Sequence, residues 1–471
     1  MIELMKEKSL IDGLKLALKK SKNKKSPIAF SYTYQIDVRD ILPFLSHPSD
    51  KNLFRVYWEQ PLNRISFAGL GKIIAFDIQN FKSKLDMNRN IIKFLNNSIS
   101  ISDDSLIYPK IFGGHCFSQY NGSDQTWKNF PKSTFHFPEC LATLNDDGSW
   151  LTISKLIYPS DMIDIIYSNF KKLCISYNNR LSITLPSISR VSIKESSDIP
   201  SESNYKKIIH SVLNQIKPKK IEKVVISRSQ HLKIDDEFDV ISAMQVLRYI
   251  YPKCTNYFFE YPDKGIFFGS TPERLVSLKA EYLCTDVLAG TVARGKNMEE
   301  DRLLEQLLIN SHKERQEHTL VLEQVVKKLR PISKTLKCPK FPQIMKLKNL
   351  QHLYSPITCQ LNDVNCQNIF DVLYKLHPTS AVAGTPTREA INIIKKYEFH
   401  DRGWYSGPIG WIDQNCDGDF FVAIRSALVK DHDAYIFSGA GIVAESLPDK
   451  EWEETKLKIK PILSALTGGR I

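Results

Sequence analysis

Hydrophobic and polar residues alternate along several segments of the second half of the chain, as they do in strands with one buried face. The segment 220–234 alternates in this way, and two aromatic segments are joined by a turn at residues 262–265. A third alternating segment, 274–288, is followed by hydrophobic residues at helical spacing from Glu299 to Leu329, which predicts one long helix. This part of the chain is therefore predicted to form a strand-rich block followed by a helix.

The same order recurs later without sequence identity. Alternating segments cover residues 407–413, 419–429 and 434–443, with polar turns between them, and a helix is predicted from Pro448 onward. Strands joined by short turns form antiparallel sheets, and helices must cover the hydrophobic face of such sheets. We expect an α+β architecture of mainly antiparallel sheets with helices outside, and not a doubly wound parallel sheet.

The first part of the chain predicts short strands bounded by turns over residues 26–190, after a lysine-rich helix at 9–25. Residues 192–205 are rich in serine and acidic residues and are interpreted as a connector. The predicted division is an N-terminal region, 1–204, that packs on the core, and a catalytic region, 205–471.

Composition and charge narrow the class of protein. With 42% hydrophobic and 25% charged residues among 471, the chain is typical of globular proteins and not of disordered or coiled-coil ones. The 64 basic and 52 acidic residues give a net charge of +12, which suits nucleic acid, an anionic membrane surface or an anionic small substrate. A solvated helix end is the favoured interpretation of the N-terminal lysines, and a non-catalytic basic binding protein remains the alternative class.

The nine cysteines show no CxxC pair or zinc-site spacing and are expected to be reduced. The N-terminus lacks the features of a secretory signal, and no apolar run approaches the roughly 18 residues of a membrane-spanning helix. These observations predict a cytoplasmic protein.

Two pairs of glutamates on the predicted helices are candidate metal ligands. Glu314 and Glu317 are three residues apart, as are Glu451 and Glu454, so each pair shares one helical face. Carboxylate oxygens suit Mg²⁺. A solvated charged face is the commoner explanation of either pair alone, but both pairs follow equivalent strand blocks.

Candidate acid and base groups lie at strand ends. Glu273 follows a predicted strand, and Lys223 begins another, with its side chain on the same face as Val225. Partial burial of Lys223 would lower its pKa and let it act as a base. The alternative for each is a surface residue at a strand end.

Glycines and one arginine are candidates for anion binding. The segments Gly290–Thr291 and Gly439–Gly441 each follow a predicted strand, where backbone N–H groups can approach an oxyanion. Arg425 alternates with Ala423 and Ala427 along a predicted strand, and if it is buried it requires an anionic partner. An exposed arginine on an edge strand fits the same pattern.

Taken together, these motifs resemble the chorismate-utilising enzymes, the family of isochorismate synthase, salicylate synthase, anthranilate synthase component I and aminodeoxychorismate synthase component I. The resemblance extends over about residues 205–466. Ten blocks carry it in the family's order: KVVISR (223–228), FFGSTPERLVS (267–277), LAGTVARG (288–295), SHKERQEH (311–318), LQHLYSPI (350–357), LHPTSAVAGTP (376–386), DRGWYSGPIGW (401–411), VAIRSALV (422–429), SGAGIVAES (438–446) and EWEETKLK (451–458).

The resemblance implies a four-layer α+β sandwich of two sheets flanked by helices, and chorismate, a dianion, as substrate. It implies that Glu317 and Glu454 bind Mg²⁺ directly, while Glu314 and Glu451 hold metal-bound waters. The implied residues for the substrate carboxylate are Tyr405, Arg425, Gly439 and Lys458, and those near the ring are Gly290, Thr291 and His352.

The nucleophile distinguishes the branches of the family. Lys223 matches the lysine base of the enzymes that add water at C2, and Ala289 stands where aminodeoxychorismate synthases have a nucleophilic lysine. Water addition at C2, with Glu273 protonating the leaving C4 hydroxyl, is therefore implied, and no glutamine amidotransferase partner is expected. The blocks 376–386 and 401–411 are most similar to isochorismate synthases, including those that feed menaquinone synthesis, and salicylate synthase is the alternative.

Two departures from the family pattern accompany the resemblance. LAGTVARG lacks the usual Arg-Pro after Gly-Thr, and STPE replaces the commoner SPE.

Overall fold

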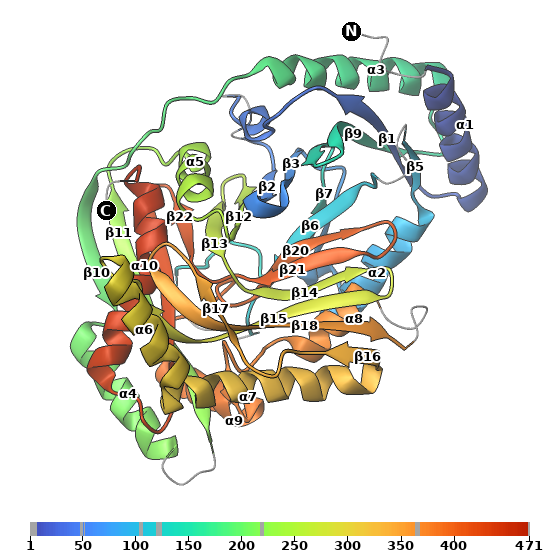
Figure 1. Cartoon of the computed structure of the whole chain (residues 1–471). Coiled ribbons are helices and arrows are strands. Elements are labelled where there is room, and N and C mark those ends of the chain that lie inside the picture. Colours follow the sequence, from blue (N-terminus) through green and yellow to red (C-terminus); the bar gives the residue numbers. More distant parts are fainter. Residues whose placement is uncertain are drawn as a thin grey trace.

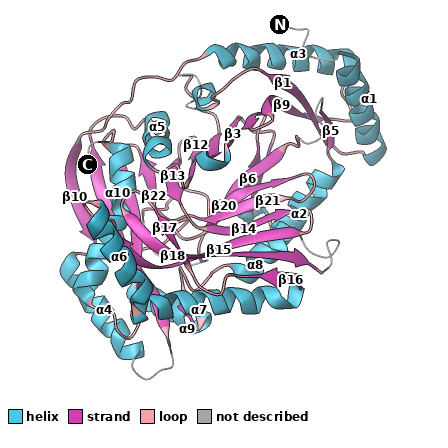
Figure 2. Ribbon diagram, in the orientation of Figure 1, coloured by secondary structure: helices cyan, strands magenta, loops and turns pink. Residues whose placement is uncertain are grey.

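Two large sheets and the helices around them form the structure, a computed structural model that describes residues 7–47, 50, 52–102, 107–118, 125–216, 221–362 and 368–469 (Figure 1). Helices cover the outside of the sheets (Figure 2). The α-helices of the described part are α1 (Glu7–Lys24), α2 (Lys84–Asn97), α3 (Ile163–Asn179), α4 (Glu202–Ile216), α5 (Val240–Ile250), α6 (Met298–Asn310), α7 (His312–Leu329), α8 (Ile369–Leu376), α9 (Thr387–Tyr397) and α10 (Pro448–Leu466).

The larger sheet has 13 strands and contains strands from both halves of the chain. Strands β1 and β5 run parallel, and every other pairing between described strands of either sheet is antiparallel. In spatial order the strands are β10 (Ile193–Ile199), β11 (Lys223–Ile234), β23 (Asp433–Ile442), β22 (Ser426–Lys430), β13 (Gly265–Thr271), β12 (Thr255–Tyr261), β2 (Arg55–Gln60), β3 (Ile65–Leu70), β8 (Cys140–Asn145), β9 (Gly148–Ile157), β1 (Ile28–Ile36) and β5 (Ile99–Ser102), with β19 (Gly384–Thr385) beside β11.

The second sheet has ten strands and likewise joins the two halves of the chain. Its order is β16 (Ser333–Lys337), β18 (Leu350–Leu361), β15 (Tyr282–Ala293), β14 (Arg274–Lys279), β21 (Gly418–Val422), β20 (Pro408–Asp413), β6 (Lys110–His115), β7 (Ser133–Phe137) and β4 (Ile74–Asp77), with β17 (Gln343–Lys346) beside β18. Because both sheets include strands from before and after residue 204, the predicted division at that residue does not separate two sheets, and it stays a prediction.

An aromatic core holds the two sheets face to face. Trp58 on β2 packs edge-on against Phe421 on β21, with ring centroids 5.5 Å apart, and Phe67 on β3 makes the same kind of contact with Trp411 on β20. Each buried aromatic side chain removes roughly 150–250 Å² from water, so this layer contributes strongly to stability. With helices on the outer faces, the fold is the predicted four-layer α+β sandwich.

The chain passes between the sheets twice. Strand β13 lies in the larger sheet and β14 in the second, so the chain changes sheets at Pro272–Glu273. The return passage is at Ala423–Arg425, between β21 and β22. The predicted repeat of strands followed by a helix is confirmed. The first block contributes three strands to the larger sheet and two to the second, and the later block contributes two strands to each sheet.

Three local predictions were wrong. The helix predicted from Glu299 to Leu329 is two helices, because Ser311 ends α6 and its hydroxyl accepts a hydrogen bond from the Glu314 N–H as the N-cap of α7. The predicted connector 192–205 contains the edge strand β10, which pairs with β11 along its polar residues. Arg425 does not lie in a strand: it has a left-handed φ of 51° at the break between β21 and β22.

Candidate active site

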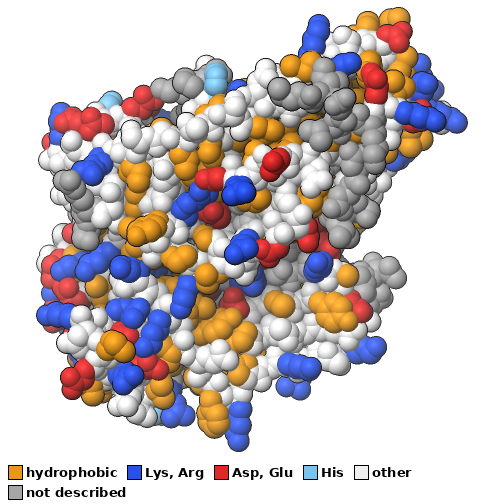
Figure 3. Space-filling view, turned by 45° about the horizontal axis from the view of Figure 1, so that its top comes forward, with side chains coloured by type: hydrophobic (Ala, Val, Ile, Leu, Met, Phe, Trp, Pro, Cys, Tyr) orange, Lys and Arg blue, Asp and Glu red, His pale blue; other side chains and the backbone are white. Residues whose placement is uncertain are grey.

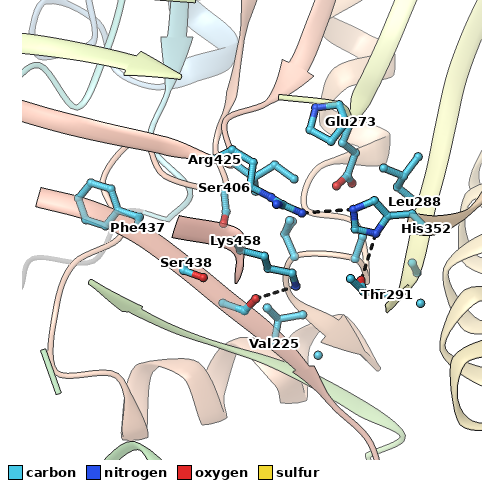
Figure 4. Close-up of a pocket in the computed structure, with 18 of the residues that line it drawn as sticks. Val225, Glu273, Leu288, Thr291, His352, Ser406, Arg425, Phe437, Ser438 and Lys458 are labelled. Carbon is cyan, nitrogen blue, oxygen red and sulfur yellow. Dashed lines mark hydrogen bonds between the residues drawn. The ribbon is translucent and has the colours of Figure 1, made fainter. Parts of the chain in front are cut away.

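A deep pocket opens where the two sheets and helices α7 and α10 meet, and most of the predicted site residues line it. Strand ends, the two passages between sheets and the two helices each contribute side chains (Figure 4). The lining residues are Val225, Pro272, Glu273, Leu288, Ala289, Gly290, Thr291, Glu317, His352, Ala381, Val382, Tyr405, Ser406, Ile424, Arg425, Phe437, Ser438, Gly439, Gly441 and Lys458.

Arg425 supplies a buried positive charge to the pocket. Its Nη2 lies 3.3 Å from Nε2 of His352, whose Nδ1 is 3.1 Å from the Thr291 hydroxyl. Burial, reinforced by the nearby Arg425, holds the pKa of His352 well below its usual range, so the imidazole is neutral and Nε2 accepts from the guanidinium. No carboxylate of the described residues lies within 4.0 Å of this guanidinium, which leaves its charge available to an anionic ligand.

Glu273 lies across the pocket opening from the positively charged side chains of Arg425 and Lys458 (Figure 4). In Figure 4 its carboxyl group points toward the space that is bordered by Arg425, His352 and Lys458. Burial raises the pKa of Glu273 to about 7, although Lys223 lies close enough to lower it. A carboxyl group with this pKa holds a proton over much of the neutral range, and can donate it to a leaving oxygen.

Lys223 is buried at the start of β11 and forms an ion pair with Glu317. The Nζ–Oε1 distance is 2.8 Å, and the lysine side chain is 1% exposed. Burial raises the pKa of Glu317, but the ammonium groups of Lys223, Lys458 and Lys313 together outweigh this effect and lower the pKa overall. The pair fits only because residue 441 is glycine: a Cβ there would lie 2.5 Å from Oε1 of Glu317 and 2.8 Å from Cε of Lys223.

The other three glutamates of the predicted metal site are also engaged by donors. Lys458 pairs with Glu454 at 2.5 Å, and Lys313 lies 2.7 Å from Glu451. The Thr291 N–H donates to Glu314 at 2.8 Å. Burial and the nearby Glu317 raise the pKa of Glu314, while burial and Glu454 raise that of Glu451 to about 7.

The donor set fits Mg²⁺ in its chemistry, since it consists of carboxylate oxygens whose mutual repulsion a cation would relieve. In the described residues, however, no three His, Cys, Asp or Glu side chains are grouped closely enough to hold a metal ion. The lysine ammonium groups currently balance the carboxylates, so the roles of the four glutamates as metal ligands stay predictions.

The two glycine segments were predicted to follow strands, but each lies within a strand. Gly439–Gly441 lies inside β23, where Gly439 is opposite Ser227 and Gly441 is opposite Val225 of β11. Gly290 forms a bulge with φ of 80° within β15, which continues through Ala293. Strand β15 thus keeps its pairing with β18 without the family's Arg-Pro.

Sequence reasoning missed several residues of the site. Lys313 directly precedes Glu314 in the sequence, and this position was a signal that it could pair with acidic residues of the site. In the structure it lies near Glu314 and Glu451. Ser406 and Ser438 also line the pocket, but nothing in the pattern of the sequence distinguishes them. Tyr405, by contrast, is where the resemblance implied, stacked on Phe437 with ring centroids 5.4 Å apart.

The surface and the cysteines bear on the remaining predictions. On the face in Figure 3, lysine and arginine side chains are interspersed with acidic and hydrophobic ones. No described helix is both long enough and apolar enough to cross a membrane. Eight cysteines are unpaired in the described part of the chain, and Cys366 lies outside it.

Comparison with known proteins identifies the family. A family model described as "Chorismate binding enzyme" matches residues 16–467. The chain belongs to this family. The match extends well into the first half of the chain, beyond the blocks that carry the resemblance.

Named relatives and a solved structure agree with this family. The chain is 30% identical over 465 residues to isochorismate synthase MenF of Bacillus subtilis, covering 96% of this chain and 97% of the relative. It is 28% identical to the salicylate biosynthesis isochorismate synthase of Pseudomonas aeruginosa, covering 94% and 90%. The structure of the menaquinone-specific isochorismate synthase MenF from Escherichia coli has the same fold, with a TM-score of 0.77, 23% identity and coverage of 98% and 100%.

Proposed function

We propose that this enzyme is an isochorismate synthase, which converts chorismate reversibly to isochorismate by adding water at C2 and removing the C4 hydroxyl. The observation that carries the proposal is one cationic pocket lined by Glu273 and by Glu317, with the buried Lys223 paired to Glu317 behind its wall. The family membership and the similarity to relatives named isochorismate synthases support the same reaction.

The cationic residues of the pocket suit a dianionic substrate. Arg425 and Lys458 present positive charge, and Tyr405 lies beside Gly439, so these four residues are proposed to bind substrate carboxylate. Gly290, Thr291 and His352 border the pocket on the side of β15 and β18 and are proposed to lie against the ring. The N–H of Thr291 is already taken by Glu314, so its hydroxyl is the group that remains for the ring.

The neutral amine of Lys223, formed when its ammonium releases a proton to solvent, is proposed to take a proton from the attacking water. Glu273 is proposed to give its proton to the departing C4 hydroxyl as the double bond moves. The pKa of about 7 supports Glu273 as the acid, since its protonated form is present at neutral pH. Glu317, which lines the pocket, pairs with the Nζ of Lys223 and is proposed to orient it for proton transfer.

Mg²⁺ is the proposed cofactor, with Glu317 and Glu454 as direct ligands and Glu314 and Glu451 holding its waters. When bound, Mg²⁺ would reduce the electrostatic repulsion between the substrate carboxylate and the surrounding glutamates. The raised pKa values of Glu314 and Glu451, caused by burial and by the neighbouring acids, support a cation here.

The unpaired cysteines support a cytoplasmic location, and the product is proposed to feed menaquinone or siderophore synthesis.

The product test separates the proposed activity from salicylate synthase, which eliminates pyruvate from bound isochorismate. We expect isochorismate as the main product from chorismate and Mg²⁺, with little salicylate fluorescence until an isochorismate pyruvate-lyase is added. Chromatography of the mixture identifies the products. Strong fluorescence without the lyase, at the rate of chorismate loss, would assign the enzyme to the salicylate branch, and binding without turnover would support the non-catalytic alternative.

Ammonium salts are expected not to yield anthranilate or aminodeoxychorismate, and a glutamine-hydrolysing partner is not needed. Ammonia is already a nucleophile, whereas water needs the base that Lys223 supplies, and residue 289 is alanine. Chromatography after incubation with ammonium at alkaline pH tests this expectation. Either amino product would contradict the assignment to the water branch.

The activity should fall as the pH rises through about 7, because Glu273 must be protonated to act as the acid and its pKa is raised to about 7. The profile of kcat/KM reports this group in the free enzyme. In Glu273→Gln, kcat should drop by roughly 10²–10⁴-fold and this limb of the profile should disappear. A variant that keeps both the wild-type rate and the same limb would exclude Glu273 as the acid.

A further inference from the structure

A buried ion pair behind the pocket joins three segments of its wall. Glu398 follows α9 and Arg402 precedes β20, and neither side chain lines the pocket. Arg402 Nε donates to Glu398 Oε2 at 2.8 Å, and the two side chains are 2% and 3% exposed. The Arg402 guanidinium also lies over the ring of Phe117, 4.4 Å from its centroid.

The rest of this pair's hydrogen bonds go to pocket segments. Arg402 donates to the carbonyl of Val225 at 2.8 Å and to that of Val382 at 2.7 Å. Glu398 accepts from the Ser227 N–H at 2.7 Å. Val225 and Val382 line the pocket, and Val225 lies two residues after Lys223 on the same face of β11.

The third segment is the turn that carries Tyr405. The Tyr405 N–H donates to the Arg402 carbonyl at 2.8 Å, so the turn begins at the arginine itself. Within it Gly403 has φ of 50° and Ser406 has φ of 61°. Positive φ is unfavourable for serine, so contacts from outside the turn must hold its shape.

We propose that Glu398 and Arg402 are positioning residues that fix the Tyr405 turn relative to the strand of Lys223; this inference rests on the proposed function. Strand β11 pairs with β19 at Lys223 and Val224 and with β23 from Val224 onward, whereas the turn is not part of a sheet. Loss of the pair therefore displaces Tyr405 more than Lys223. Substrate binding weakens, and the proton transfer of bound substrate is largely kept.

The test compares single and double substitutions of the pair. Arg402→Met alone leaves a buried carboxylate unpaired, which destabilises the fold, whereas replacing both members with apolar residues restores much of the stability. The double variant Glu398→Leu/Arg402→Met is expected to regain most of the Tm of the wild type. Its KM for chorismate should stay about tenfold or more above wild type, with kcat within about threefold.

A matched control and a conservative variant separate positioning from simple stability. The control is Arg55→Met/Glu260→Leu, a buried ion pair between β2 and β12 in which the arginine also donates to a backbone carbonyl, that of Leu45. It should show the wild-type KM. Arg402→Lys keeps the charge but loses the fork that reaches two carbonyls, and its KM should lie between those of the wild type and the double variant.

The outcomes decide between the two proposals. If the wild type does not convert chorismate, the proposed function is wrong, whatever the variants do. If it does, a folded double variant with the wild-type KM overturns the positioning role, as does an equal rise of KM in the control pair. If the double variant fails to fold, a wild-type KM in Arg402→Lys overturns it instead.

Discussion

Lys223→Ala should lower kcat by roughly 10²–10⁴-fold, the usual effect of removing a positioned base. The ammonium is buried at the start of β11 and lies 2.8 Å from Glu317, which lines the pocket. Steady-state rates of chorismate loss measure the effect. The matched control is Lys233→Ala on the same strand, which removes an exposed lysine paired with Asp433 and should keep the wild-type rate.

Loss of Lys223 also leaves Glu317 buried without its partner, which can disturb the fold. Lys223→Arg addresses this problem, because a guanidinium keeps the pair with Glu317 but stays protonated and cannot act as a base. We expect this variant to unfold near the wild-type temperature and to be as slow as Lys223→Ala. A Lys223→Arg enzyme with the wild-type kcat would show that this residue serves as a charge and not as a base.

Activity should require Mg²⁺, and both Glu317→Gln and Glu454→Gln should abolish it. The two glutamates lie on α7 and α10 with Glu314 and Glu451 nearby, and four carboxylates would repel a dianionic substrate without an intervening cation. Assays in EDTA, with Mg²⁺ added back, measure the requirement.

The control for this prediction is Glu453→Gln, which changes an exposed carboxylate on the same helix that pairs only with Lys456. It should keep the wild-type dependence on Mg²⁺. Full turnover in excess EDTA would refute the metal assignment, and turnover by Glu317→Gln at the wild-type rate would refute the role of that residue.

Hydrophobic periodicity predicted the architecture because the antiparallel strands and outer helices each bury one face. The end of a strand at Glu273 was also predicted, since a proline and a polar residue end the alternation there, but the change of sheet at this point was not. The break at Arg425 was not: small apolar residues on either side continue the alternation, and the left-handed backbone leaves no mark in an arginine. The break at Ser311 was missed because a serine fits within a helical pattern until its side chain caps the next helix.

For the site, residue type and spacing identified the acidic pairs, but not what balances them. Glu317 pairs with Lys223, 94 residues earlier in the chain, and Glu454 pairs with Lys458, four residues later. Only the fold brings Lys223 into contact with its partner. Arg402 was likewise within a recognised block, yet two of its acceptors, the carbonyls of Val225 and Val382, lie on separate segments that the sequence does not connect.

The two passages of the chain between sheets run side by side, because β13 pairs with β22 and β14 pairs with β21, and both Glu273 and Arg425 line the pocket. Each passage spans the distance between the sheets, and the thickness of the aromatic layer sets that distance. Trimming a ring such as Trp58 or Phe421, neither of which lines the pocket, would let the sheets settle closer together. The substrate preference of this enzyme can thus be changed through residues that never touch the substrate, because the aromatic interior sets the distance between the sheets that carry the pocket residues.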